Sequence, residues 1–361
     1  MTLPALYRFY AAEMSYFSGK VRPAFQFKAI HYVELLPDFV NVIIPRTGLS
    51  FIPVVITPDD ETLQDTSEIL DELERRFPTP ALYPATPVQR VSALLWELYA
   101  DEFLVLPAMH YRWSFPESEA KARAEFAACS PEPERAVSFA NRMKGTLPFL
   151  GVTTETVPAI EAHTRDLLQR LSAHLEVHPY LFGTRPSLAD CALLGPLYAH
   201  LYMDAVPGRL LRETAPLVCR WIERMNHLDP STPGEWLADD ALAPTLRPLL
   251  ELIGRDAAPV ILDTVRAFES WADMRPTGQD EPMRAVGTHD TRLRGIAMTR
   301  YTSSYTLWMV QRSLDAHRAL AADERAKVDA TLAGTGLESL LAYEPRHRLG
   351  KRRFKLVFKK S

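Results

Sequence analysis

The sequence predicts a small α/β domain followed by an almost wholly helical region, and two observations lead to this fold class. Strand-like and helix-like patterns alternate through about the first 80 residues, whereas from Pro87 onward apolar residues recur at spacings of three and four. Proline and glycine mark the joints between the helical segments. We expect an α/β domain at 1–80, an all-helical domain at 87–235, and an additional region at 236–361 that is mostly helical with a possible hairpin.

The elements of the first domain follow from local patterns. The segment ALYRFYA has period two and predicts a strand. The segment KVRPAFQFKAI has helical spacing, and its Pro23 is tolerated only near a first turn, so we expect this helix to start at Ser18 or Gly19. Three further strands and an amphipathic helix follow, in the segments HYVELL, FIPVVIT, ETL and DTSEILDELERRF.

The region after Pro87 is predicted to consist of successive helices. Their approximate positions are 88–110, 117–128, 131–144, 155–177, 187–203 and 214–227. Ser187 and Asp190 have the spacing of a capping box, with Asp in place of Glu, and predict a helix start. In the additional region, MRAVGTHDTRLRGIAMTRYTS alternates enough to predict a hairpin, and RRFKLVF near the C-terminus predicts a basic strand.

The charge of the chain is unevenly distributed. The 361 residues have a net charge of −4, but the segment from Arg346 to Ser361 holds eight Lys or Arg and no acid. The rest of the chain, with 33 basic and 45 acidic side chains, therefore carries −12. This balance argues against a general nucleic-acid-binding protein. The basic tail is predicted either to touch an anionic surface or to dock on the acidic body of its own chain.

Cysteine usage and hydropathy indicate the compartment. Three widely spaced cysteines, with no CxxC pair, favour buried thiols in a reducing compartment over a disulfide framework. No apolar run reaches the ~18 residues needed to span a membrane, and the N-terminus lacks the pattern of a secretory signal. His174 and His178 have no apparent third partner, so we expect surface histidines and no metal site. The expectation is a soluble cytoplasmic protein.

Two segments of the first domain have the chemistry of a peptide-binding site. Pro53 opens an edge strand, and a cis bond before it leaves the backbone N–H and C=O of Ile52 available to an extended peptide. Asp65 and Thr66 stand at a helix start, where free N–H groups and the helix dipole favour a ligand carboxylate. The Asp65 carboxylate can meet a ligand ammonium, and a γ-glutamyl group carries both charges on one carbon.

The stretch SYFSGKVRPAF supplies a third element, a hydroxyl at the start of the first helix. Such a hydroxyl either caps the helix or donates to a ligand thiolate. In the second case the helix dipole adds to it and lowers the thiol pKa from ~8.5 towards neutral. Both interpretations remain open for Ser18.

Taken together, these segments resemble the glutathione S-transferase family. The segment SYFSGKVRPAF is similar to the first-helix motif of that family, FIPVVI to its cis-proline strand and LQDTSEILDELERRFP to its glutathione-binding helix. The segment YLFGTRPSLADCALLGPLY is similar to the capping-box segment of its helical domain. The four motifs occur in family order over roughly residues 4 to 230, whereas 236–361 looks like an extension found in a subset of the family.

The resemblance implies a thioredoxin-like domain followed by a helical domain, with glutathione as co-substrate, a small electrophile held between them, and a homodimer. Carried over to this chain, it implies that Ile52, next to Pro53, binds the cysteinyl backbone. It also implies that Asp65 and Thr66 bind the γ-glutamyl end, and Arg46 is a candidate for the glycyl carboxylate.

The resemblance further implies that Ser18 stabilises the thiolate. The loop before the first helix is two or three residues longer than the family usually shows, so Ser15 and Tyr16 are alternatives. No cysteine precedes Cys129, which argues against a thiol-transferring branch of the family.

Two functions follow from this resemblance. The first is an enzyme that adds the glutathione thiolate to a small electrophile, without nucleic-acid or membrane partners. The second is a non-catalytic protein of the same fold that acts as a binding or interaction module. The intact Asp65–Thr66 pair favours the enzyme, and the long extension favours the module.

Overall fold

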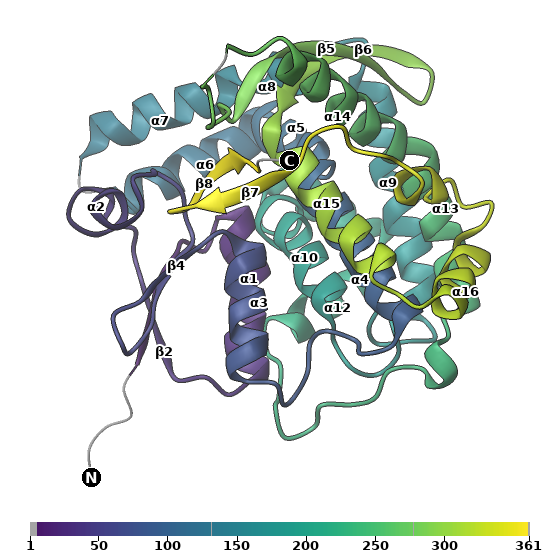
Figure 1. Ribbon diagram of the computed structural model, residues 1–361. Helices are drawn as coiled ribbons and strands as arrows, with labels where there is room; N and C mark the ends of the chain where they lie inside the picture. Colours follow the sequence, from purple (N-terminus) through teal and green to yellow (C-terminus); the bar gives the residue numbers. More distant parts are fainter. Residues whose placement is uncertain (1–5, 131, 277, 360–361) are drawn as a thin grey trace. The chain divides into compact units, whose positions relative to one another are not determined.

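The computed structural model describes residues 6–130, 132–276 and 278–359 (Figure 1), and these form two compact units. Unit 1 comprises 6–83, 111–142 and 178–236, and unit 2 comprises 84–110, 143–177 and 237–359. The additional region therefore shares a unit with α4 (Pro87–Glu102) and α9 (Val157–Leu175), two helices of the predicted helical region.

Unit 1 begins with a four-stranded mixed sheet. Its elements are β1 (Tyr7–Tyr10), α1 (Tyr16–Phe27), β2 (Tyr32–Leu35), a π-helical turn (Phe39–Ile43), α2 (Ile44–Thr47), β3 (Val54–Ile56), β4 (Thr62–Gln64) and α3 (Thr66–Arg76). The strand order is β2-β1-β3-β4; β1 and β2 are parallel, and the other two pairs are antiparallel. With its β1–α1–β2 crossover, this is the thioredoxin-like domain that the sequence predicts.

Successive side chains of the strands point to opposite faces of this sheet, and both faces are buried. Phe9 and its cross-strand partner Val55 are fully buried, and the ring centroid of Phe9 lies 5.3 Å from that of Phe25 in α1. The next pair along, Tyr10 and Val54, points to the other face, because successive side chains of a strand alternate. There these two residues cluster with Ile43 from the π-helical turn.

The rest of unit 1 is helical. Its helices are α6 (Pro116–Ala128), α10 (Leu188–Pro196), a π-helical segment (Leu197–Tyr202), α11 (Ala205–Thr214) and α12 (Pro216–Met225). The predicted capping box is confirmed, since the backbone N–H and the hydroxyl of Ser187 both donate to Asp190, at 2.9 and 2.8 Å. The sequence prediction missed α11, whose first two turns contain Pro207 and Gly208.

Unit 2 contains the following further elements. They are α8 (Leu147–Leu150), short 3-10 turns (Ala238–Asp240 and Pro244–Leu246), α13 (Arg247–Asp256), α14 (Ala258–Asp273), β5 (Ala285–Leu293), β6 (Ile296–Ser303), α15 (Ser304–Arg318), α16 (Ala322–Leu332), α17 (Glu338–Leu341), β7 (Leu349–Arg352) and β8 (Lys355–Phe358). Two helices, α5 (Val105–Trp113) and α7 (Pro133–Gly145), include the chain positions where one unit ends and the other begins. The predicted hairpin is confirmed as β5–β6, and the predicted C-terminal strand is a second hairpin. Within the described ranges, no helix is both long and apolar enough to cross a membrane.

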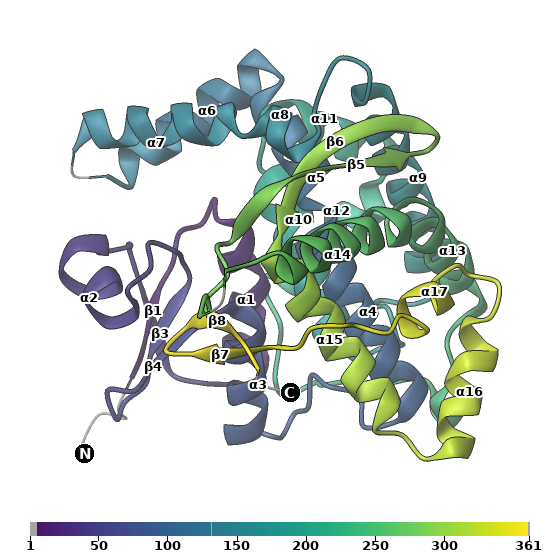
Figure 2. The same ribbon diagram turned by 45° about the horizontal axis from the view of Figure 1, so that its top comes forward.

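The additional region completes α4. The N-cap residue of this helix, Thr86, makes no side-chain capping bond. Instead, the Asp240 carboxylate accepts the backbone N–H groups of Val88 and Gln89, at 2.8 and 3.0 Å. Further along, α15 runs beside α4, as both views show (Figures 1 and 2). The first helix after the α/β domain thus takes its cap and part of its packing from residues beyond 236.

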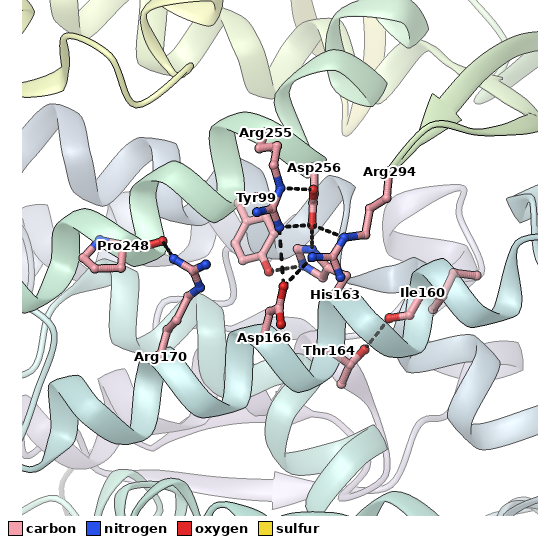
Figure 3. Close-up of polar contacts among 10 residues, drawn as sticks. All are labelled: Tyr99, Ile160, His163, Thr164, Asp166, Arg170, Pro248, Arg255, Asp256 and Arg294. Atoms are coloured by element: carbon pink, nitrogen blue, oxygen red, sulfur yellow. Dashed lines mark hydrogen bonds and ion pairs between the residues drawn. The ribbon is translucent and has the colours of Figure 1, made fainter.

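A buried polar chain also joins α4, α9 and α13 (Figure 3). The Tyr99 hydroxyl lies 2.7 Å from Nε2 of His163, and Nδ1 of the same ring lies 2.9 Å from the Asp256 carboxylate. Arg255 donates to Asp256 at 2.8 Å, and Arg294 lies 3.4 Å from it. Burial lowers the pKa of His163 although Asp256 opposes this, so the ring is neutral at pH 7. Since the Tyr99 side chain is fully buried, this polar network joins helices and lies out of reach of a ligand in solvent.

The basic tail pairs with acidic residues of its own unit. Arg348 makes a two-pronged ion pair with Asp315, at 2.7 and 2.6 Å. Arg352 donates to Glu281 at 2.9 Å. The second of the two expectations for this segment, docking on the acidic body of the chain, is therefore confirmed for these side chains.

Candidate functional site

The strand register brings the three predicted site segments to one end of the sheet. Tyr10, the last residue of β1, pairs with Val54, the first residue of β3, and Val54 pairs with Gln64, the last residue of β4. The loop to α1, the Ile52–Pro53 segment and Asp65 all leave the sheet at this end. Antiparallel pairing places the end of one strand beside the start of the next, which accounts for this convergence.

Ile52, two residues before β3, lies next to a cis proline. The Ile52–Pro53 peptide bond is cis, as the family motif predicts. In the described part of the chain, the backbone N–H and C=O of Ile52 form no hydrogen bond. The prediction of an edge strand is wrong, because β3 lies between β1 and β4. Pro53 is tolerated because it precedes the first paired residue, so no ladder bond needs its N–H.

The start of α3 is built around Asp65. This residue is the N-cap, and its carboxylate accepts the backbone N–H of Ser67 at 2.8 Å. Its φ of +82° is unfavourable for a residue with a side chain, and such strained conformations cluster at functional sites. Thr66, the first helical residue, is buried apart from a small exposed surface. That this pair contacts a γ-glutamyl group remains a prediction.

The three candidate hydroxyls differ in exposure. Ser15 is the N-cap of α1, its Oγ accepts the Ser18 N–H at 3.3 Å, and it is partly exposed. Ser18 is 0% exposed, and its own Oγ accepts the Ala12 N–H at 3.4 Å. Tyr16 is also buried, with its ring centroid 5.5 Å from that of His200. Of the three residues, Ser15 is the most exposed.

The first helix starts earlier than the sequence predicts. It begins at Tyr16 rather than at Ser18 or Gly19, because Ser15 supplies the cap. Pro23 therefore lies inside the helix, where its ring removes the N–H that would bond to the Gly19 carbonyl. The surrounding apolar side chains are buried, and their packing offsets the missing bond.

Two cations near the site have defined partners. Lys20, which sequence reasoning did not single out, is 0% exposed, and its Nζ donates to the Ser67 Oγ at 3.3 Å. Arg46 donates to both Asp60 carboxylate oxygens, at 2.8 and 3.0 Å, and to Thr62 at 3.1 Å. The contact of Arg46 with a glycyl carboxylate remains a prediction.

The residues that the structure describes contain no group of three or more His, Cys, Asp or Glu placed to hold a metal ion. The expectation that His174 is a surface residue is wrong. It is fully buried, and its Nδ1 lies 2.8 Å from the Thr245 hydroxyl. The four-residue spacing of His174 and His178 did not reveal that Thr245, from the additional region, covers this helix face.

Comparisons with solved structures give low similarity. A beta-etherase from Sphingobium sp. strain SYK-6 is 19% identical with a TM-score of 0.46, and the match covers 62% of this chain and 96% of that one. A glutathione S-transferase from Rhodospirillum rubrum F11 is 16% identical with a TM-score of 0.43, over 66% and 97%. One from Methylobacterium radiotolerans JCM 2831, in complex with glutathione sulfonate, is 19% identical with a TM-score of 0.40, over 66% and 99%. No curated protein sequence matches the chain.

Two domain models of one family match parts of the chain. The glutathione S-transferase N-terminal domain matches residues 9–81, which include all the candidate site residues. The glutathione S-transferase C-terminal domain matches residues 139–229. Residues beyond 229, including the whole additional region, lie outside both models. Residues 9–81 and 139–229 therefore match the N- and C-terminal domains of the glutathione S-transferase family.

Proposed function

We propose that the chain is a glutathione transferase that adds the glutathione thiolate to a small electrophile. The observation that carries this proposal is the meeting of the α1 start, the Ile52 backbone and the Asp65–Thr66 pair at one end of the sheet. The match to these two domains supports glutathione as the co-substrate. It also supports a homodimer, which we propose as the assembly.

The three segments match the parts of the tripeptide. The N–H groups at the start of α3, with the Thr66 hydroxyl, suit the γ-glutamyl carboxylate, and the Asp65 carboxylate suits the neighbouring ammonium. The unpaired N–H and C=O of Ile52 suit the cysteinyl backbone, in the manner of one added antiparallel strand residue. This arrangement directs the sulfur towards the start of α1.

We assign the thiol-facing hydroxyl to Ser15 rather than to Ser18 or Tyr16. A ligand sulfur cannot touch a side chain with no exposed surface, which argues against Ser18. Ser15 is partly exposed, and its oxygen accepts the Ser18 N–H through a lone pair, so the Ser15 O–H is left to donate to a thiolate. The amino end of the 12-residue α1 adds a favourable dipole.

The reaction is a nucleophilic addition or substitution at carbon. The thiol proton passes to solvent, and the thiolate lone pair forms the new S–C bond. In a substitution the leaving group departs with its bonding pair. In an addition, the displaced π electrons move to the electron-withdrawing group of the electrophile, which then takes a proton from water. The protein contributes a higher thiolate fraction and a fixed position for the sulfur.

The test compares Ser15→Ala with Ser18→Ala. The thiolate of bound glutathione is titrated by its ultraviolet absorbance, and conjugation is measured with an activated aryl chloride. We expect Ser15→Ala to raise the pKa of the bound thiol by about 1. Ser18→Ala should leave it unchanged. A Ser15 variant with an unaltered titration would refute this assignment.

Binding is tested separately from chemistry. The double variant Asp65→Ala with Thr66→Ala should weaken glutathione binding at least about 10-fold in calorimetry, since charge-assisted hydrogen bonds are lost. If the wild-type protein binds glutathione yet never conjugates an electrophile, the binding-module alternative replaces the enzyme. If millimolar glutathione gives no heat at all, both functions fail.

A further inference from the structure

His200 is a buried histidine without a hydrogen-bond partner. It lies in the π-helical segment Leu197–Tyr202 of unit 1, its exposed fraction is 6%, and in the described part of the chain neither ring nitrogen takes part in a hydrogen bond. The other buried histidines of the described ranges each have a side-chain partner, and they are His110, His163, His174 and His317. Since native proteins pair nearly all buried polar groups, the isolated ring of His200 needs an explanation.

Arg112 fixes the position of His200 relative to the start of α1. This buried guanidinium, also in unit 1, donates to the backbone carbonyl of Met14 at 2.9 Å and to that of Ala199 at 2.6 Å. Met14 directly precedes the N-cap of α1 and Ala199 directly precedes His200, so the two segments lie within the span of one side chain. The ring of Tyr16 also contacts the ring of His200, with centroids 5.5 Å apart. His200 is therefore held beside the helix start to which we assign the thiol-facing hydroxyl.

The surroundings of His200 make its ring a neutral hydrogen-bond donor. Burial, together with the positive charges of Arg112 and Lys121, lowers the pKa of His200 well below 6.5, so the imidazole is uncharged at pH 7. A neutral imidazole carries its proton on one nitrogen only. Nδ1 is buried and has no acceptor in the described chain, so a proton there would be a buried donor without a partner. We assign the proton to Nε2, and the ring retains a small exposed surface through which a ligand can be met.

We propose that His200 donates a hydrogen bond from Nε2 to the electrophile, and that the site thereby selects α,β-unsaturated carbonyl compounds. The inference rests on the proposed function and deepens it by naming the substrate class. Such a compound has an acceptor oxygen conjugated with the carbon that the thiolate attacks. A neutral donor suits the uncharged carbonyl oxygen of the bound substrate, and the hydrogen bond strengthens as this oxygen gains charge in the transition state.

The chemical step needs no further reactant. The thiolate lone pair forms the S–C bond at the β-carbon, and the π electrons of the C=C bond shift so that the carbonyl oxygen gains the negative charge of an enolate. His200 keeps its proton and stabilises this charge through the hydrogen bond. Water then protonates the α-carbon, which completes the thioether. Because the donor acts on charge that develops in the transition state, its loss should lower kcat more than it raises KM.

The experiment compares two electrophiles, using the full-length chain at saturating glutathione. Benzylideneacetone has the conjugated carbonyl, whereas benzyl chloride has no acceptor oxygen. His200→Phe keeps a ring against Tyr16 but removes the donor, so kcat/KM for benzylideneacetone should fall at least about 10-fold, mostly in kcat. The value for benzyl chloride should be unchanged. The ultraviolet titration of bound glutathione should be unchanged too, because His200 acts on the electrophile and not on the thiol.

Two further variants are the controls. His200→Gln places an amide N–H close to the position of Nε2 and should restore most of the rate with benzylideneacetone. Tyr202→Phe removes a donor from the same π-helical segment, but one that bonds to Glu223 at 2.8 Å, so it should leave the rates with both electrophiles unchanged. If His200→Phe does not fold, His200→Leu takes its place, because it is smaller and equally lacks a donor.

The outcomes separate this inference from the function beneath it. If the wild-type protein conjugates none of these electrophiles, the aryl chloride included, the proposed function fails and the inference falls with it. If it conjugates the chlorides but not benzylideneacetone, the inference alone is overturned. The inference alone is also overturned if the donor-free variant slows both substrates equally or neither, if His200→Gln fails to restore the rate, or if the thiol titration shifts in the donor-free variant.

Discussion

Replacing Asp256 by Asn tests whether the additional region is an integral part of unit 2. The Asp256 side chain is fully buried and accepts hydrogen bonds from His163 at 2.9 Å and from Arg255 at 2.8 Å, as Figure 3 shows. Burial alone would raise the pKa of this carboxyl, but the bonds from His163 and Arg255 lower it from 3.8 to about 2. The variant keeps the shape of the side chain and removes its charge.

The expected magnitude follows from this pKa. A fall of nearly two in pKa corresponds to about 2 kcal/mol of preference for the charged form. Removing the carboxylate also takes a charged acceptor from the buried, neutral His163 and from the partly exposed Arg255 and Arg294, which adds to this loss because hydrogen bonds to a charged group are worth about 1.5–3 kcal/mol. We therefore expect Asp256→Asn to destabilise unit 2 by roughly 2–4 kcal/mol. The same pKa gives the pH dependence of this stability. Because the native pKa of Asp256 is depressed, the wild-type protein loses this stability as pH falls from about 4 to about 2.

Hydrogen exchange measures this loss locally. Peptides from α4, α9 and α13 should exchange at least about 30-fold faster at pH 7 in the variant, while peptides from the sheet of unit 1 serve as internal controls. Asp315→Asn is the matched control, because its carboxylate pairs with Arg348 at the surface and is worth at most about 1 kcal/mol. Equal exchange in the two variants would refute the view that the polar chain holds these helices together.

Two further predictions concern packing and pH. In Gly254→Ala the new Cβ would lie 2.0 Å from the backbone oxygen of Thr335, so we expect a loss of about 1–3 kcal/mol in thermal or urea unfolding. Gly145→Ala, whose Cβ meets nothing within 4 Å, should be neutral or slightly stabilising; a similar loss in both would contradict the close approach. Burial and the charge of Arg300 lower the pKa of His289 from 6.5 to about 4, so the unfolded chain binds this proton first as pH falls. Stability should therefore decline from pH 6.5 towards pH 4, and His289→Gln should flatten part of that decline in urea midpoints measured across the window.

Local periodicity predicted most elements of the fold. The strands at Tyr7–Tyr10 and Tyr32–Leu35, the helix at Thr66–Arg76 and the hairpin β5–β6 all follow from spacings of two or of three and four. The misses have local causes as well. The expected helix start at Ser18 or Gly19 rested on Pro23 lying near a first turn, but Ser15 caps the helix and Pro23 lies inside it. Helix α11 was not predicted because Pro207 and Gly208, two residues that disfavour helices, lie in its first two turns.

What the sequence could not reveal depends on contacts between distant residues. Nothing near Val88 indicates that its N–H is capped by Asp240, and nothing near His174 indicates that Thr245 covers it. Family motifs mark Ile52, Asp65 and Thr66 in the sequence, and the strand register brings their segments to one end of the sheet. Their contact with glutathione remains a prediction. The burial of Lys20 beside Ser67 was not predicted, because it arises from packing between α1 and α3, which the order of residues does not show.

The residue that caps α4 is synthesised long after the helix itself. Asp240 follows Val88 by 152 residues, so a ribosome working at about 5–20 residues per second releases the helix roughly 8–30 s before its cap exists. Throughout that interval the nascent chain already contains every strand of the thioredoxin-like sheet, while α4 still lacks its cap and the α15 residues that pack against it. Unit 1 is itself complete only at residue 236, so both units depend on segments that are made late.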